Sequence, residues 1–264
     1  QRLRAEAAHA EPGPILRRIA WGVGLLVTAL LLVLVASFVL IQTETGKEWL
    51  RTRLSDLLSS PPDRRIELGR IEGTLPWGVN LESLTLADSE GPWLLVSRIE
   101  LRWSPWELLR GEIRIEELSA ASVEMMRRPL SQGKEPAAEA GIPDVTFRAP
   151  PLTMDLFSIP SVSISEKVLG HAIALEIMGF IQPTLEATGR SLALQLKRLD
   201  EGPELRAHLD VQFQSSSASM KLDLEVFEAA GGMLSQMTGL KDTGALQLRI
   251  NGAGPSSEWK GSVY

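Results

Sequence analysis

The sequence contains no cysteine and only three histidines among its 264 residues. The absence of cysteine excludes disulfide scaffolds, thiol catalysis, cysteine-ligated zinc and iron–sulfur clusters. Aromatic residues make up 5%, and the formal net charge of −6 has the wrong sign for a nucleic-acid-binding protein. The hydrophobic fraction of 44% is near average and excludes a polytopic membrane protein, while the charged fraction of 23% excludes wholesale disorder.

Motifs that carry chemistry are also missing. The sequence has no G-x-S-x-G nucleophile elbow, no P-loop, no H-E-x-x-H motif and no EF-hand loop. Beyond the N-terminal region the histidines are His171 and His208, and His208 shares the polar positions of an alternating segment with Arg206 and Asp210. We therefore expect no enzyme activity, no catalytic residue, no metal site and no cofactor.

One long hydrophobic run lies near the N-terminus. Residues 19–41 contain no charged residue, and a helix of that length is about 34 Å long, enough to cross a hydrocarbon core of about 30 Å. The alternative is a cleaved signal peptide, whose apolar core is about 7–15 residues long. Apolar residues continue past the possible cleavage triplet at residues 35–37, so we predict an uncleaved transmembrane helix.

The residues that flank this run predict its orientation. Positive residues favour the cytoplasmic side of a membrane, and the bias here is slight, because Arg2, Arg4, Arg17 and Arg18 precede the run and Lys47, Arg51 and Arg53 follow it. The length of the chain after the run, more than two hundred residues, decides more. The rest of the chain contains no second hydrophobic span. We expect residues 1–18 to be a cytoplasmic tail and the bulk of the chain to lie in the periplasm of a Gram-negative bacterium, anchored by a single pass through the cell inner membrane.

A short amphipathic helix is predicted after the hydrophobic run, within residues 42–60. Residues 45–48 fit a capping box, and leucines then recur on one helical face before a pair of prolines ends the pattern, at Leu50, Leu54, Leu57 and Leu58. Two interpretations remain open. The helix either lies on the membrane or plugs one end of the following domain, or it packs on the core of that domain.

Past residue 63 the hydrophobic period changes to two, which is typical of half-buried antiparallel strands. In one such segment Leu209 and Val211 alternate with His208 and Asp210. We count about a dozen short strands, with small helical insertions at residues 105–109 and 227–240.

A low-complexity stretch at residues 131–143 predicts a flexible loop. It divides the β-rich part into a first segment, residues 63–130, and a second segment, residues 144–264. The two segments are compatible with one continuous, mostly antiparallel sheet.

The alternation assigns a set of apolar side chains to one face of this sheet. They are Leu95, Ile99, Leu101, Ile113, Ile115, Leu175, Ile177, Leu192, Leu194, Leu196, Leu209, Val211, Leu222, Leu224, Val226, Leu246, Leu248 and Ile250. A second sheet could cover this face and form a closed sandwich, or the sheet could curl and leave the face as an open groove. Periodicity alone does not separate these alternatives, and a one-residue bulge would move part of the set to the other face.

Several segments in order resemble the N-terminal region of the TamB-like family, within the wider AsmA-like group. These segments are residues 66–76 (IELGRIEGTLP), Leu81, Leu84, Leu86, Asp88, Gly91, Trp93, residues 101–105 (LRWSP), 108–111 (LLRG), 127–129 (RRP) and 252–261 (GAGPSSEWKG). Residues 45–50, after the predicted anchor, are also similar to the family. The resemblance covers the chain from about residue 15 to its end.

The resemblance implies a mainly β protein. Its N-terminal transmembrane helix and short amphipathic helix precede an elongated, curled antiparallel sheet with an apolar groove, a β-taco-like fold. Members of this family are much longer, so we expect this chain to be a fragment.

Two functions follow from the resemblance, and neither involves nucleic acid. The first is an inner-membrane-anchored periplasmic conduit that moves phospholipid between the inner and outer membranes. The second is a periplasmic scaffold or chaperone for the assembly of outer-membrane proteins, including autotransporters, with an outer-membrane barrel partner of the TamA type. In the first case the apolar residues assigned above to one face of the sheet line a lipid groove.

Overall fold

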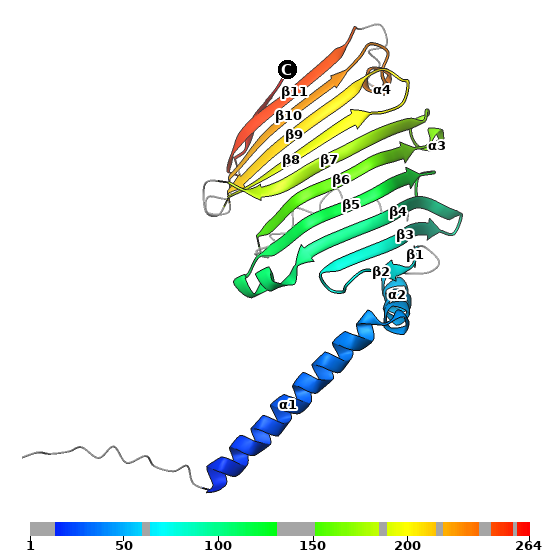
Figure 1. Ribbon diagram of the computed structural model, residues 1–264. Coiled ribbons are helices and arrows are strands. Elements are labelled where there is room, and N and C mark those ends of the chain that lie inside the picture. Colours follow the sequence, from blue (N-terminus) through cyan, green and yellow to red (C-terminus); the bar gives the residue numbers. More distant parts are fainter. Residues whose placement is uncertain are drawn as a thin grey trace, which may run out of the picture. The chain divides into compact units, whose positions relative to one another are not determined.

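A computed structural model describes residues 14–59, 64–130, 151–184, 189–214, 219–237, 244–255 and 258–264 (Figure 1). The chain divides into two compact units, Gln1–Lys47 and Glu48–Tyr264. The predicted loop at residues 131–143 and most of the predicted cytoplasmic tail lie outside the described residues.

The first unit is dominated by helix α1 (Pro14–Gln42). Its segment Gly24–Gln42 is long and apolar enough to cross a membrane, by length and composition. Every side chain at residues 24–41 is exposed, and the exposed fraction of Leu26 is 71%. A continuous apolar surface of this kind is stable in hydrocarbon and unfavourable in water.

Helix α2 (Glu44–Leu58) follows directly. Its N-terminus is capped by Thr43, whose Oγ1 accepts a hydrogen bond from the Gly46 backbone N–H at 3.1 Å. The capping box predicted at residues 45–48 is therefore wrong, because the helix begins before Thr45. The carboxylate of Glu48 accepts a hydrogen bond from Arg51 Nε at 3.0 Å instead of reaching back to the cap.

The second unit is built on one sheet of twelve strands. The strands are β1 (Arg65–Leu68), β2 (Ile71–Glu72), β3 (Gly78–Asp88), β4 (Gly91–Ser104), β5 (Ile113–Met125), β6 (Leu152–Ile164), β7 (Ile173–Pro183), β8 (Gly189–Arg198), β9 (Leu205–Gln214), β10 (Ser219–Glu228), β11 (Leu246–Pro255) and β12 (Lys260–Val263). From β3 to β12 they follow the order of the chain, and β1 and β2 both pair with β3. All pairs are antiparallel except β5 and β6, which are parallel and therefore end at the same edge of the sheet.

Three short helical segments lie at the ends of strands. They are η1 (Pro105–Arg110), α3 (Glu166–Leu169) and α4 (Met233–Met237). The helical insertion predicted at residues 105–109 is confirmed by η1. The insertion predicted at residues 227–240 is shorter than expected, because Phe227 and Glu228 still belong to β10 and pair with β9 and β11.

Helix α2 covers the free edge of β1. Arg51 Nη1 donates a hydrogen bond to the Leu68 carbonyl at 3.1 Å, and Ser55 Oγ accepts one from the Leu68 N–H at 3.4 Å. Ser59 Oγ accepts another from the Ile66 N–H at 2.9 Å. Backbone groups at a sheet edge are otherwise available to pair with another chain, so these side chains close that edge.

The sheet forms a single curled layer, and every described strand belongs to it (Figure 1). Few side chains are consequently buried. The core consists of Val162, Ile173, Leu175 and Leu205, where the exposed fraction of Ile173 is 3%. Most other apolar strand residues are only half-buried, so the open, curled sheet is observed and the closed sandwich is not.

This architecture predicts different costs for the same substitution at two positions of β9. Leu205 is 5% exposed, whereas Leu209 is half-buried on the same face. We expect Leu205→Ala to lower the free energy of unfolding by about 2–5 kcal/mol, and Leu209→Ala by about 1 kcal/mol or less, because much of its side chain already contacts water. Urea-induced unfolding followed by circular dichroism would measure both losses. Equal losses would show that Leu209 lies in a closed core.

Candidate functional site

The candidate site is the apolar face of the sheet, which we call the inner face. Cross-strand partners lie on the same side of a sheet, and successive pairs define an unbroken central row from β3 to β12. It consists of Val79, Leu101, Leu118, Phe157, Gly179, Leu194, Leu209, Leu224, Ile250 and Val263. No charged or polar side chain interrupts this row.

The glycine in the central row is covered by its neighbour. A Cβ atom built on Gly179 would lie 2.5 Å from Leu194 Cδ2, so the leucine side chain occupies the space that a larger residue would need. The apolar surface is therefore continuous across this position.

Two further rows flank the central one. The first contains Trp103, Ile115, Met154, Ile181, Leu192, Val211 and Leu222. The second contains Leu81, Ile99 and Ala120 in β3–β5, and Ile159, Ile177, Leu196, Ala207, Val226 and Leu248 in β6–β11. Most of the residues that the sequence assigns to a groove thus lie in these three rows.

Three of the remaining predicted groove residues lie on the same face but outside these rows. Ile113 pairs with Leu152 at the start of β5, and Leu246 pairs with Glu228. Leu175 belongs to the buried core.

Leu95 is separated from the others by a slip in the alternation. Successive cross-strand pairs lead from Val96 to Leu175 of β7, and from Leu101 to Gly179. Leu175 and Gly179 lie on one face because they are four positions apart. Val96 and Leu101 are five positions apart, so β4 must place two consecutive residues outward between them. Arg98 lies in this interval with φ +47°, a left-handed conformation that re-aims the strand.

The slip moves Leu94, and not Leu95, onto the inner face. Leu94 pairs with Leu86 and Met125, whereas Leu95 pairs with Thr85 and Glu124. The sequence assignment of Leu95 to the same face as Ile99 does not agree with this register.

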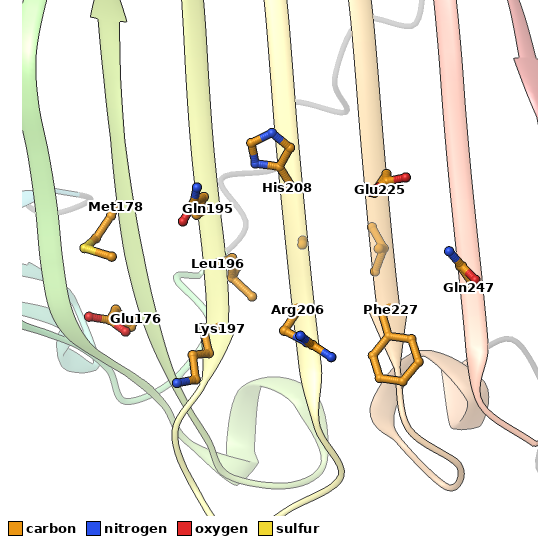
Figure 2. A pocket seen from close by; sticks show the side chains of 12 residues that line it. Glu176, Met178, Gln195, Leu196, Lys197, Arg206, His208, Glu225, Phe227 and Gln247 are labelled. Carbon is orange, nitrogen blue, oxygen red and sulfur yellow. The ribbon is translucent and has the colours of Figure 1, made fainter.

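The opposite, outer face is polar. A hollow of about 400 Å³ lies over β7–β11, and its lining includes charged side chains of both signs, such as Glu176, Lys197 and Glu225 (Figure 2). The guanidinium carbon of Arg206 lies 5.3 Å from the centroid of the Phe227 ring. His208 pairs with Gln195 and Glu225 on this solvated face, and no group of residues suited to a metal ion occurs in the described part of the chain.

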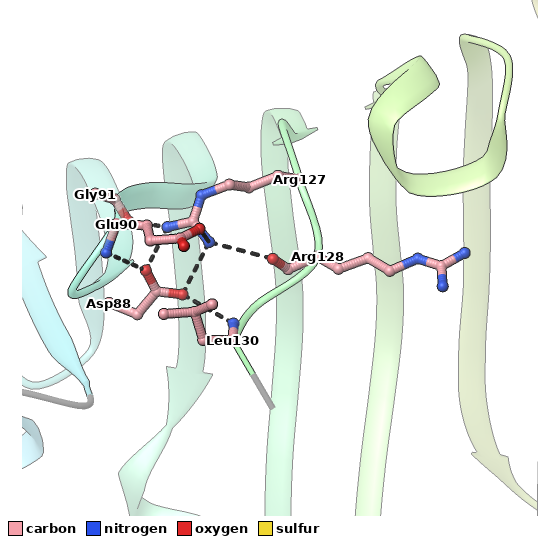
Figure 3. A network of polar contacts seen from close by, with 6 residues as sticks. All are labelled: Asp88, Glu90, Gly91, Arg127, Arg128 and Leu130. Atoms are coloured by element: carbon pink, nitrogen blue, oxygen red, sulfur yellow. Dashed lines mark hydrogen bonds and ion pairs between the residues drawn. The ribbon is translucent and has the colours of Figure 1, made fainter. Parts of the chain in front are cut away.

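Polar contacts close one long side of the inner face. This side is the edge formed by strand ends, where β3, β5, β6, β8 and β10 finish. The first contact joins Asp88 to Arg127, whose side chains are 4% and 19% exposed (Figure 3). Asp88 also accepts hydrogen bonds from the backbone N–H groups of Glu90 at 2.9 Å and Leu130 at 3.0 Å, and Arg127 donates to the Gly91 carbonyl at 2.5 Å. The hydrogen bond from Arg127 holds the pKa of Asp88 well below its usual range.

The second contact holds α3. Arg128 extends away from Arg127 (Figure 3), and its Nε donates to the Val168 carbonyl at 2.9 Å. Ser165 Oγ donates to the Met126 carbonyl at 2.5 Å. Val168 is thereby buried over the end of the sheet.

The third contact joins Arg198 and Asp200 at 2.7 Å, with the Arg198 side chain 7% exposed. Asp200 also accepts hydrogen bonds from the backbone N–H groups of Ala174 at 2.7 Å and Gly202 at 2.8 Å. These bonds join the end of β8 to the start of β7.

The fourth contact holds α4. The carboxylate of Glu228 is fully buried and accepts hydrogen bonds from the N–H groups of Leu234 and Ser235, both at 2.9 Å, and from Ser235 Oγ at 3.2 Å. Leu234 and Met233 pack against the core. The edge marked by Asp88, Val168, Arg198 and Glu228, which we call the clasped edge, is thus closed by buried and satisfied polar groups.

The glycine-rich motif near residue 252 shapes the far end of the inner face. Gly252 and Gly261 are cross-strand partners, and a Cβ on either would collide with the indole ring of Trp259. Only glycine at both positions lets the ring lie flat against the sheet. Trp259 therefore supplies the apolar surface that the two glycines lack.

Comparison with known proteins identifies a family for this chain. A protein-family model, YdbH-like, described as intermembrane phospholipid transport protein YdbH, matches residues 29–261. Searches of curated proteins and of solved structures found no match. The match confirms the AsmA-like resemblance at the level of a related family, and the assignment to TamB itself stays a prediction.

The contribution of the Asp88–Arg127 ion pair to stability can be tested by substitution. Asp88→Asn removes the charge that pairs with Arg127, so we expect the Tm to fall by several degrees at neutral pH. Because the pKa of Asp88 is lowered in the folded protein, the contribution of the pair is present above about pH 4 and is lost as the pH falls through the lowered pKa.

The matched control is Asp155→Asn, since Asp155 forms an ion pair with Arg114 at 3.0 Å on the exposed outer face. Exposed pairs contribute little, and its Tm should stay near that of the wild type. Thermal unfolding at several pH values would measure both variants. An Asp88→Asn defect that persists unchanged at low pH would contradict the assigned role of the pair.

Proposed function

This chain belongs to the YdbH-like family, and from that premise we propose that it is the membrane-anchored part of a conduit for phospholipid. In this proposal the acyl chains lie on the inner face, and the polar headgroups remain in water. The observation that carries the proposal is the central row, which runs through every strand from β3 to β12 without a polar side chain and is not covered by a second sheet.

The energetic argument is the cost of exposing lipid to water. A phospholipid with two chains of about 16 carbons exposes about 30 methylene groups, and at about 0.8 kcal/mol each its transfer through water costs roughly 24 kcal/mol. A continuous apolar track removes that barrier, whereas isolated pockets do not. The nine strand-to-strand steps from β3 to β12 extend the track over about 43 Å at ~4.8 Å per step.

Helix α1 would anchor the conduit where lipid enters it. We propose that α1 crosses the cell inner membrane with its N-terminus in the cytoplasm, because Arg17 and Arg18 lie on that side of the apolar run. The sheet then lies in the periplasm. The phospholipid would then move between the inner membrane and the outer membrane. This topology and this route are the ones expected from the sequence.

The alternative is a scaffold for outer-membrane protein assembly with a TamA-type barrel partner. Such a scaffold would bind unfolded clients by adding their strands to an open sheet edge. At β1 that mode is blocked, because side chains of α2 already bond the backbone of Ile66 and Leu68. The structure therefore favours lipid on the face over a client strand at this edge.

Photo-crosslinkers placed at matched positions of the two faces would test the proposal. The inner positions are Leu194, Leu209 and Leu224 of the central row. Each has a neighbour in sequence that points to the outer face, and these neighbours pair with one another: Gln195, His208 and Glu225. We expect several times more phospholipid adduct from the inner positions, detected by mass spectrometry after crosslinking in cells.

A single charge in the central row should stop transport. Leu209→Glu is expected to abolish the lipid adducts while the protein is still expressed and folded, because a carboxylate on an apolar track is costly to desolvate. Gln212→Glu on the outer face of the same strand is the control. Equal labelling from both faces, or adducts with unfolded outer-membrane proteins in place of lipid, would contradict the conduit.

A further inference from the structure

Arg190 lies on the inner face, at the edge opposite the clasped edge. It pairs with Phe213 of β9 and Pro183 of β7. Two residues further along β8, Leu192 belongs to one of the apolar rows, so alternation places Arg190 on the same side of the sheet. A guanidinium group is thus set among apolar side chains.

The other charged residues on the described strands of this face have partners. They are Asp88, Arg198 and Glu228, and all three belong to the clasped edge. Asp88 pairs with Arg127, Arg198 pairs with Asp200, and Glu228 accepts three hydrogen bonds from α4. Each of these charges is therefore compensated within the protein.

Arg190 differs from them. Its Nη1 donates a hydrogen bond to the carbonyl of Gly189 at 2.9 Å, its Nε is buried without a hydrogen-bond partner, and no acidic residue in the described part of the chain forms an ion pair with it. A guanidinium presents a planar fork of donors that fits a phosphate in a bidentate manner. An anion from outside the chain would satisfy these donors.

The inner face beside Arg190 is open to water, as the exposure of its cross-strand partner Phe213 shows. Phe213 is 43% exposed, so this edge of the inner face is open to water where the clasped edge is closed.

We propose that Arg190 binds the phosphate of a phospholipid whose acyl chains lie on the inner face and point toward the clasped edge. This inference rests on the proposed function and names the group that orients the lipid. The distance fits: six residues from Arg190 to Leu196 span about 20 Å of strand, and the acyl chains of one leaflet occupy about 15 Å, half of a hydrocarbon core of ~30 Å.

The opposite orientation is disfavoured by Arg198. That guanidinium occupies the same face at the other end of β8, but Asp200 already neutralises it and its side chain is 7% exposed. A phosphate at the clasped edge would meet a compensated and buried charge, whereas at Arg190 it meets a charge that no acidic residue in the described ranges neutralises.

The test compares two lipids with identical acyl chains. The full chain, purified in detergent, is titrated with dioleoylphosphatidylglycerol or with uncharged dioleoylglycerol, and bound lipid is counted by native mass spectrometry. We expect Arg190→Gln to weaken binding of the phospholipid about tenfold, the effect of losing one charge-assisted contact, and to leave dioleoylglycerol binding unchanged. Arg190→Lys should restore part of the loss.

Lys197→Gln is the matched control, because Lys197 lies on the outer face of the same strand. It should bind both lipids as the wild type does. Inorganic phosphate at millimolar concentration should not displace the phospholipid, and displacement would assign Arg190 to a free anion and overturn the proposal.

Two further results would overturn it. If the Arg190→Gln variant binds the phospholipid as tightly as the wild type, Arg190 does not contact the phosphate. A variant that loses both lipids equally shows that Arg190 acts only on the shape of the face. Failure of the wild type to bind either lipid would instead overturn the proposed function, so the two failures are distinguishable.

Discussion

A single sheet keeps one apolar face only if every strand directs its apolar side chains to the same side, and the rest of this structure depends on that constraint. Side chains alternate with a period of two, so any irregularity in one strand must be matched in its neighbours. The register shift in β6 between Ile159 and Val162 is matched in β4 by the left-handed Arg98. Strands β3–β6 share the extra residue, and the bulge between β6 and β7 absorbs it, so the central row continues without interruption from β3 to β12.

A face that is left open cannot supply the packing that normally holds a sheet in shape, and the clasped edge compensates for this. Its four polar contacts join neighbouring strand ends and hold α3 and α4 over the core around Ile173. Buried charges are tolerated there because each has a partner. The structure thus concentrates its buried polar groups and its core along one edge, which leaves the middle of the face free for a ligand.

Simple alternation made β8–β11 predictable from sequence, because Leu194, Leu209 and Leu224 fall at every second position and pair directly. In β3–β6 the apolar spacing changes from two to three at one level of the sheet, and the sequence assignment of Leu95 missed this change. The sequence does contain this change, as one pair of apolar residues three positions apart in each of the four strands: Leu81 and Leu84, Val96 and Ile99, Ala120 and Val123, and Ile159 and Val162. The polar contacts were not predictable, because they join residues that are brought together only by the fold, such as Asp88 and Arg127, 39 positions apart.

The two edges of the inner face give it a direction that its apolar rows lack. Rows of leucine and valine would accept an acyl chain in either orientation, since burial of hydrocarbon is not directional. β8 carries an arginine at both ends of the face. Among the described residues, Asp200 neutralises the one at the clasped edge, and no acidic residue forms an ion pair with the other. The alternation of apolar and polar residues is the same at both ends of β8. The end at Arg190 can nevertheless bind a charged group, while the end at Arg198 faces the hydrocarbon chains. This difference between Arg190 and Arg198 lies in their partners and not in the strand pattern, so a search for apolar alternation alone would not detect it.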